Sequence, residues 1–413
     1  AVAAFSGVVV FVLRVRAPCW LGGSTHGLCS SASTLQRSAL GGASRLPQAR
    51  ASTSFLGRLA AVPVAGRGAP TAQDGDGTDA ARAAEVDPAA AERPGAVFVS
   101  VVAFSDPELP VTLRSMLLQA KHPERLYVGL VWQGFDGEEP LASDEIEDLC
   151  QLWGVSECGA RPYENSALAD VFNSGTLPLP ASREHSLAEL AGGHIRLLKF
   201  RAEDARGLCW ARYLAQHLWA GEEFYMQVDS HMRFVPNWDA EMHRQLAWCA
   251  TQSAKPVLST YGRGYTLGTP PDWKPPKEAS TPDLICAGFF DSNQVLNIQS
   301  RPIKHLENPR RNPFWSGHFS FSSSQILREV PYDPQCLMLL FGEEPLMATR
   351  LFTHGWDVYT PSRGLLFHLW ERDYRRTFFE MKELYAELLP RTLRRVFWLQ
   401  GAGPPPPAGE RQA

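Results

Sequence analysis

Apolar strand-like runs alternate with helix-like segments from residue 97 onward, and this alternation most constrains the fold. Residues 97–104 form a β-branched and aromatic run, residues 109–120 resemble a helix with Pro110 in its first turn, and residues 126–132 form a second apolar run. A strand, a helix and a strand in this order make a βαβ unit with parallel strands. The sequence therefore predicts an α/β fold on a mixed, mostly parallel sheet flanked by helices.

A second unit of the same kind follows a polar insertion at residues 134–193. It consists of a predicted strand at 194–200, a helix at 205–219 and a strand at 223–228. Ligands of such sheets bind beyond the carboxyl ends of the strands. The residues directly after Val228 are therefore where we expect chemistry.

The ends of the chain differ in composition from this region. Residues 1–95 are rich in Ala, Gly, Ser and Pro and predict a disordered or targeting leader, residues 96–395 predict one catalytic domain, and residues 396–413 predict a Pro-rich disordered tail. The apolar residues 1–13 are fewer than the ~20 that span a membrane. They fit the remnant of an anchor or targeting signal, the one basis for a membrane contact, and equally an unstructured extension.

Charge and cysteine content exclude two classes. Lys and Arg total 40 against 44 Asp and Glu, a net charge of -4, so we expect no nucleic-acid partner. The eight cysteines contain no CxxC pair that would indicate a zinc knuckle. Cys150 and Cys158 are close enough to bridge in an oxidising compartment, but spacing alone does not establish a disulfide.

The triplet Asp229-Ser230-His231 directly follows the predicted strand. Residues i and i+2 at a strand end point to the same side, so a carboxylate and an imidazole can bind one hard divalent cation. Such a cation neutralises a diphosphate leaving group. Alone, the triplet fits better an Asp that caps the next turn beside a surface His.

A further candidate metal ligand, a histidine, lies in the C-terminal half of the chain. Residues 341–353 predict a helix that Gly355 ends, residues 357–360 a strand, and residues 365–367 a short strand that brings His368 to its end. Its apolar neighbours allow either a core histidine or a third metal ligand.

Nine short segments resemble the family of hydroxyproline N-acetylglucosaminyltransferases that modify the F-box adaptor subunit of ubiquitin ligases in protists. They are VFVSVVAFSDPE (97–108), HPERLYVGLVWQ (122–133), ARG (205–207), EEFYMQVDSHMRF (222–234), KPVLSTY (255–261), FWSGHFSFS (314–322), EVPYDP (329–334), FGEE (341–344) and THGWDVYTP (353–361). Together they cover nearly the whole region between the two ends.

The chain is more distantly similar to the polypeptide N-acetylgalactosaminyltransferases. In both, an Arg stands 23 residues before the DxH aspartate and a Gly-Glu motif 25 residues before a third metal-binding His; here these are Arg206 and Glu343. Phe341 and Glu344 depart from the Gly and Asn of that family, which puts the sugar contacts in doubt.

The resemblance implies a glycosyltransferase-A type fold and a retaining transferase. It implies a UDP-sugar donor, UDP-N-acetylglucosamine, a divalent cation (Mn or Mg) held by Asp229, His231 and His368, and a protein acceptor whose hydroxyl belongs to hydroxyproline or to Ser or Thr. It also implies a cytoplasmic location, whereas a targeting signal in the leader would indicate the Golgi, the ER or another organelle.

Further residues have predicted roles at the donor. Arg206 is predicted to bind phosphate or sugar oxygens, and is otherwise a solvated helix residue. Glu343 and Glu344 are predicted catalytic or sugar-binding carboxylates, and are otherwise acids that favour a helix's first turn.

Three residues are predicted to contact the nucleotide-sugar. Asp106 follows the first strand and either binds uridine or forms a turn. Ser230 lies between two predicted ligands, and Trp315 either stacks on a sugar ring or belongs to the core.

Two other functions keep part of this pattern. A non-haem iron oxygenase also binds its metal with two His and one carboxylate, but for that class we expect an all-β fold around the site. A non-catalytic carbohydrate-binding protein of the same fold would keep the pocket. We expect acceptor contacts in the loops at 134–193 and 262–282.

Overall fold

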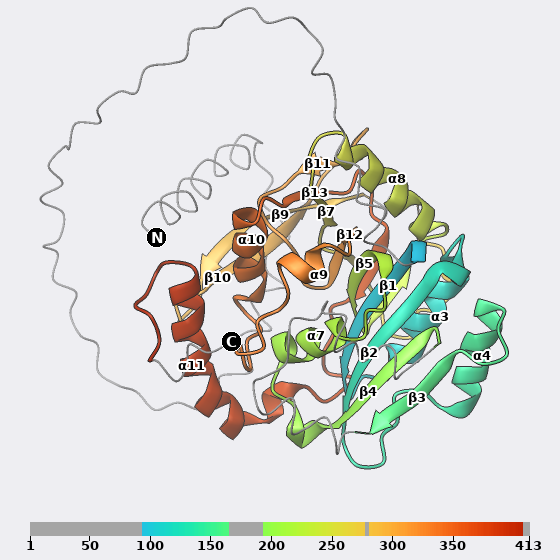
Figure 1. The fold of residues 1–413 in the computed structure, drawn as a ribbon, viewed down its shortest axis with the longest axis horizontal. Helices are drawn as coiled ribbons and strands as arrows, with labels where there is room; N and C mark the ends of the chain where they lie inside the picture. The colour runs from blue at the N-terminus through green and yellow to red at the C-terminus, as the bar shows by residue number, and fades with distance from the viewer. Residues whose placement is uncertain (1–92, 165–192, 277–280, 408–413) are drawn as a thin grey trace, which may run out of the picture. The chain divides into compact units, whose positions relative to one another are not determined.

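A computed structural model describes residues 93–164, 193–276 and 281–407 (Figure 1). The leader predicted at residues 1–95 lies almost wholly outside the described residues. The apolar segment at residues 1–13, predicted to be an anchor or targeting remnant or an unstructured extension, lies outside them as well. Within the described residues no helix is both long and apolar enough to cross a membrane.

The centre of the fold is a nine-stranded mixed sheet. Its strands are, in spatial order, β11 (Arg310–Arg311), β13 (Asp357–Thr360), β7 (Pro256–Ser259), β12 (Phe319–Ser323), β5 (Glu222–Asp229), β1 (Arg93–Phe104), β2 (Leu126–Gly134), β4 (Ile195–Arg201) and β3 (Gly159–Glu164). β5, β1, β2, β4 and β3 pair in parallel, as do β13 and β7, whereas β12 and β11 are antiparallel to their neighbours. The predicted mostly parallel α/β sheet is therefore confirmed.

Helices surround this sheet, and two small sheets lie beside it. The α-helices are α3 (Leu109–Gln119), α4 (Ser143–Trp153), α7 (Leu208–Gln216), α8 (Trp238–Ala250), α9 (Ile326–Glu329), α10 (Glu343–Thr353) and α11 (Lys382–Leu399), and the 3-10 helices are η2 (Pro123–Arg125), η4 (Ala202–Asp204) and η6 (Phe378–Glu380). One small sheet pairs β9 (Asp283–Phe290) with β10 (Leu296–Pro302), and the other has the order β6 (Met232–Phe234), β14 (Leu366–Leu369), β8 (Arg263–Tyr265).

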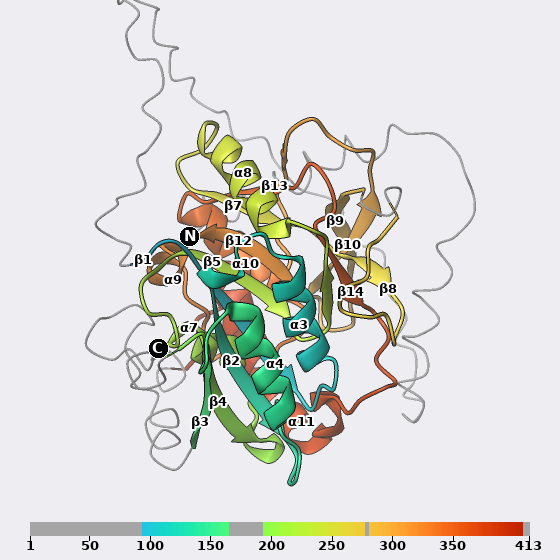
Figure 2. The same cartoon turned by 90° about the vertical axis from the view of Figure 1, so that its right-hand side faces the viewer.

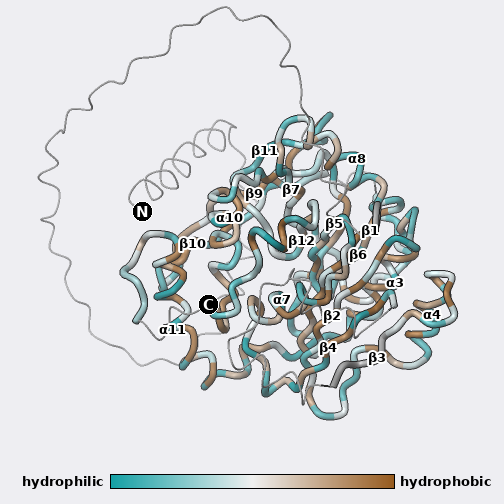
Figure 3. Tube along the Cα trace, viewed as in Figure 1, coloured by the Kyte–Doolittle hydropathy of each residue, from teal (hydrophilic) through white to brown (hydrophobic). Residues whose placement is uncertain are grey.

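The alternation of side chains along β1 explains why both faces of the sheet are covered. Val97, Val99 and Val101 belong to one apolar cluster, with residues of α3, α4 and α8, while Phe98 and Val102 belong to a second, with residues of α7, α9 and α10. Successive strand residues point to opposite faces, so an unbroken apolar run predicts a strand buried on both. Figure 2 shows α3 and α4 on one side of the strands and α7 on the other, and Figure 3 shows hydrophobic stretches along these elements.

Several element boundaries differ from those predicted. The insertion at 134–193 contains α4 and β3, and Cys150 and Cys158 form a disulfide there. α7 is shorter than the predicted helix at 205–219, because Gly207 has φ +97, which an α-helix does not accommodate. His368 lies within β14 rather than after it, and α11 continues past residue 395, where the sequence predicts the domain to end.

Candidate metal and donor site

Three predicted metal ligands meet at the edge where β5 ends. Asp229 is the last residue of β5, and His231 precedes β6. Antiparallel pairing of β6 with β14 places His368 opposite Met232, the neighbour of His231. The small sheet therefore brings a side chain from far along the chain to the end of a central strand.

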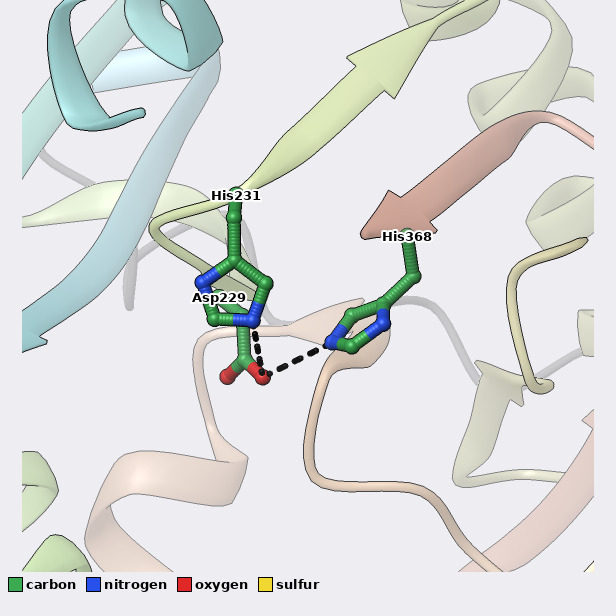
Figure 4. A group of neighbouring side chains, drawn as sticks. All are labelled: Asp229, His231 and His368. Carbon is green, nitrogen blue, oxygen red and sulfur yellow. Dashed lines mark hydrogen bonds and ion pairs between the residues drawn. The ribbon is translucent and has the colours of Figure 1, made fainter. Parts of the chain in front are cut away.

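The ligand atoms of these residues point toward one another (Figure 4). Oδ2 of Asp229 lies 3.3 Å from Nε2 of His368 and 3.8 Å from Nε2 of His231, and all three ligand atoms lie within 4.8 Å of one another. Two imidazole nitrogens and one carboxylate oxygen at this spacing fit a single divalent cation. Among the described residues, this is the one group of three or more such side chains found.

The protonation states also suit a cation. Burial raises the pKa of Asp229, but the hydrogen bond from His368 and the charge of Arg212 outweigh it and hold the pKa well below its usual range. Burial lowers the pKa of His368 well below its usual range. An ionised carboxylate and a neutral imidazole are the forms that bind metal.

A second layer of polar residues orients His231. Nδ1 of His231 lies 2.7 Å from Oδ2 of Asp106, which also accepts a hydrogen bond from Ser230 at 2.6 Å. The hydroxyl of Tyr374 donates to the other oxygen at 3.0 Å. Asp106 is 0% exposed and Ser230 is 3% exposed. The structure therefore places these two predicted nucleotide contacts behind a metal ligand, where they fix its ring.

His368 is held differently. Among the described residues its Nδ1 has no hydrogen-bond partner. Its ring packs instead against Trp370 and His318, at centroid distances of 4.2 and 4.7 Å. Burial lowers the pKa of His318 to about 3, and the backbone N–H of Gly262 donates to its Nε2, so this neighbour is uncharged.

Arg212 of α7 contacts both a predicted metal ligand, Asp229, and a predicted catalytic carboxylate, Glu343. Its Nη2 donates to Asp229 at 2.7 Å, and its Nη1 contacts Glu343 and the hydroxyl of Tyr332. Arg212 is 2% exposed. The sequence analysis missed it, and the signal that could have found it is a charged residue among the apolar residues of a buried helix.

Glu343 and Glu344 begin α10, directly after Gly342, which has φ +101. Glu343 is buried against Arg212 and Tyr332, whereas Glu344 is half-buried and accepts hydrogen bonds from Tyr261 at 2.7 Å and from the backbone of Gly317 at 3.0 Å. Burial raises the pKa of both, that of Glu344 to about 7. The two neighbouring acids therefore have different environments.

A cluster of basic residues follows β14 and faces the same edge. Nη1 of Arg372 lies 3.2 Å from Nε2 of His231, and Arg375 lies 3.4 Å from Asp106. Neither was predicted. Arg372 is exposed and brings a positively charged group beside His231.

A family profile named Glycosyltransferase (GlcNAc) matches residues 96–402. The chain belongs to this glycosyltransferase family. Together with the mixed, mostly parallel sheet, this confirms the fold class predicted from the sequence. No curated protein matches the chain.

Two solved structures are weakly similar to the chain. A crystal structure of GalNAc-T7 with UDP, GalNAc and Mn2+ has a TM-score of 0.45 and 13% identity, covering 73% of this chain and 48% of that one. Residues 1–349 of S. aureus TarS in complex with UDP-GlcNAc have a TM-score of 0.34 and 12% identity, covering 73% of each chain. The chain thus spans about half the length of the GalNAc-T7 structure.

Two residues predicted to contact the donor, Arg206 and Trp315, form hydrogen bonds to neighbouring parts of the chain. Arg206 precedes α7 and donates to the backbone oxygens of Glu203 and Ala205, at 3.2 and 3.0 Å. Trp315 is 2% exposed, belongs to an apolar cluster and donates to Ser320. Of the two roles considered for Trp315, this environment is that of a core residue.

Proposed function

We propose that this protein is a retaining glycosyltransferase that moves N-acetylglucosamine from UDP-N-acetylglucosamine to a protein hydroxyl. The observation that carries the proposal is the convergence of Asp229, His231 and His368 at the end of a parallel strand, in a chain of the glycosyltransferase (GlcNAc) family. The family's name supports the donor sugar. The resemblance to hydroxyproline transferases supports hydroxyproline, or else Ser or Thr, as the acceptor residue.

Asp229, His231 and His368 would hold a divalent cation, Mn or Mg. The chemistry of the donor set fits, because two imidazole nitrogens and an ionised carboxylate oxygen converge, and Asp106 holds the ring of His231 from its other side. Bound there, the cation would supply positive charge to a diphosphate leaving group.

Two arginines would bind the phosphates of the donor and hold the acidic residues of the site in place. Arg372 would bind phosphate oxygens, because its guanidinium lies beside the three proposed ligands and can donate hydrogen bonds to such oxygens. Arg212 would keep Asp229 and Glu343 in place, since its guanidinium contacts both. Arg212 holds its charge in a fixed position in a buried site, where electrostatic interactions are strong.

Glu344 would contact the sugar. It is the more accessible of the two adjacent acids, and a carboxyl with a pKa of about 7 can either donate or accept a hydrogen bond near neutral pH. Glu343 is already engaged by Arg212 and Tyr332, so its proposed role is to position these groups.

UDP release from UDP-sugars tests this function. The wild-type protein is assayed with UDP-GlcNAc, UDP-GalNAc and UDP-glucose, with Mn²⁺, with Mg²⁺ and with a chelator, beside Asp229→Asn. We expect release to need metal, to be fastest with UDP-GlcNAc and to fall by about a hundredfold or more in the variant. Asp136→Asn, whose side chain is 86% exposed, is the matched control.

Metal-independent release, or an Asp229→Asn variant as active as the wild type, contradicts the proposal. Transfer to short peptides that contain hydroxyproline, serine or threonine then identifies the acceptor. Retention predicts an α-anomeric product, which nuclear magnetic resonance distinguishes from the β-anomer.

A further inference from the structure

A pocket of about 430 Å³ lies beside the metal cluster but outside it. Its lining includes Arg263 of β8, Trp273, Asp283 of β9, Ser300 of β10, Phe367 of β14 and Trp370. The first two lie in the loop at 262–282, where the sequence predicts acceptor contacts. None of these residues binds the proposed cation.

Trp370 links the pocket to the reaction centre. Its ring lines the pocket and also packs against His368 at a centroid distance of 4.2 Å. Its indole N–H donates to the backbone oxygen of Gly262 at 3.3 Å, which fixes the ring. A molecule in the pocket is therefore separated from a proposed metal ligand by one aromatic ring, the position of a second substrate rather than of the diphosphate.

One nitrogen of a guanidinium and one oxygen of a carboxylate in the pocket lack a hydrogen-bond partner among the described residues. Among the described residues neither Nε of Arg263 nor Oδ1 of Asp283 forms a hydrogen bond, and the two atoms lie 3.6 Å apart. Asp283 is 8% exposed, and Ser300 donates to its other oxygen at 3.2 Å. Buried polar atoms are normally paired, so this pair fits a group that offers one acceptor and one donor side by side. In an extended chain the N–H and C=O of one residue point to the same side and offer such a pair.

The charges of the pocket favour an uncharged occupant. Arg263 and Asp283 largely neutralise each other, so a charged side chain of either sign would meet a like charge. The rest of the wall is aromatic: Trp273 packs edge-on against Phe367 at a centroid distance of 4.9 Å, and Trp370 is 45% exposed. Such walls favour an apolar side chain.

The neighbouring strand suits an extended chain. β8 is an edge strand of the sheet β6-β14-β8, and Gly264 in its middle is exposed. An edge strand offers backbone N–H and C=O groups to another strand, and a glycine there presents no side chain that would hinder the approach. A polypeptide along this edge would place a side chain in the pocket.

We propose that this pocket is the acceptor subsite and that it binds an uncharged, extended polypeptide segment along the edge of β8. An apolar side chain of the segment lies against Trp273 and Trp370, while the backbone C=O of one of its residues accepts from Arg263 and the N–H of the same residue donates to Asp283. The proposal rests on the proposed function, because it takes the acceptor to be a protein.

The test separates acceptor binding from donor chemistry. Asp283→Asn and Arg263→Gln are compared with the wild type, with Asp272→Asn, an exposed residue nearby, as the control. The probes are short peptides centred on hydroxyproline, serine or threonine and flanked by uncharged, acidic or basic residues. We measure UDP release from UDP-GlcNAc with Mn²⁺ and no peptide, glycosyl transfer to each peptide, and binding of fluorescein-labelled peptides in the presence of UDP and Mn²⁺.

We expect both variants to release UDP without peptide as the wild type does, and to bind the uncharged peptide about tenfold to a hundredfold more weakly, since each loses a charged hydrogen-bond partner. Peptide binding unchanged in both variants, tighter binding of charged peptides, or displacement of the peptide by methyl glycosides alone would overturn the inference. If wild-type protein neither hydrolyses nor transfers, the proposed function fails, and the peptide-binding measurement still decides the subsite.

Discussion

Asp106 and His231 form a hydrogen bond of 2.7 Å between a fully buried carboxylate and the ring nitrogen that faces away from the metal cluster. Burial raises the pKa of Asp106, but the hydrogen bond from His231 and the charge of Arg375 outweigh it and hold the pKa well below its usual range. The carboxylate is therefore ionised and only accepts hydrogen bonds. Nδ1 of His231 must carry the proton, which leaves Nε2 free to bind a cation.

Removing the charge of Asp106 should weaken metal binding. We expect Asp106→Asn to lower Mn²⁺ affinity by about tenfold to a hundredfold, the usual effect of losing a residue that orients a metal-binding histidine. Isothermal titration calorimetry measures it, with the exposed Asp136→Asn as control. Unchanged affinity would mean that Asp106 does not act through His231.

Arg212→Met should destabilise the protein. The substitution leaves Glu343 buried without its guanidinium partner and Asp229 without one of its neighbours. An unpaired buried charge costs about 3–5 kcal/mol, so we expect a loss of this size in the free energy of unfolding, measured with urea. Arg244→Met, at a 58% exposed arginine, should change it by less than about 1 kcal/mol.

The double variant Arg212→Met, Glu343→Gln separates the lost ion pair from lost packing. If the unpaired charge causes the destabilisation, the double variant should be more stable than Arg212→Met alone, because a neutral amide replaces the buried carboxylate. Equal stability of the two would point to packing instead.

Glu344 should make stability depend on pH below neutrality. Burial raises its pKa from 4.5 to about 7, despite the hydrogen bond from Tyr261. The folded state therefore keeps a proton that the unfolded state loses, and the stabilisation present below pH 4.5 is lost as the pH rises to about 7. The loss is at most about 3 kcal/mol.

Glu344→Gln removes this titration. Relative to the variant, the wild type should lose stability between pH 4.5 and about 7 and change little above that, as measured by urea unfolding at a series of pH values. Glu124→Gln, at a 58% exposed side chain, should leave the wild-type profile intact. A constant difference between wild type and Glu344→Gln across this window would contradict the pKa shift.

The disulfide between Cys150 and Cys158 should stabilise the region of α4 and β3. Closing a loop with a sequence separation of 8 residues contributes about 2–3 kcal/mol by restricting the unfolded chain. Dithiothreitol should lower the wild-type melting temperature but not that of the Cys150→Ser, Cys158→Ser variant. Equal sensitivity of both proteins to the reductant would show that the bridge contributes nothing.

The same bond bears on the proposed compartment. Disulfides persist mainly in oxidising compartments, so this one favours the alternative Golgi or ER location over the cytoplasmic one that the resemblance implies. Localising the full-length protein in cells, with and without its first residues, decides between them.

Local patterns in the sequence determined the central strands of the sheet and the position of the candidate site at a strand end. The unbroken apolar runs that became β1 and β2 predicted strands covered on both faces, because only such strands need apolar residues on both sides. The position of Asp229 at a strand end predicted where ligands would gather. Its pairing with His231 followed from two-residue spacing, a property of the backbone alone.

Only the tertiary structure decided which side chains contact one another around the candidate site. Asp106 forms a hydrogen bond to His231, Trp315 lies in the core, and Arg212, an arginine on a buried helix, contacts both Asp229 and Glu343. Each of these contacts joins residues separated in sequence. A side chain's partner across such a distance depends on how whole elements pack, and no local pattern of residues records that packing.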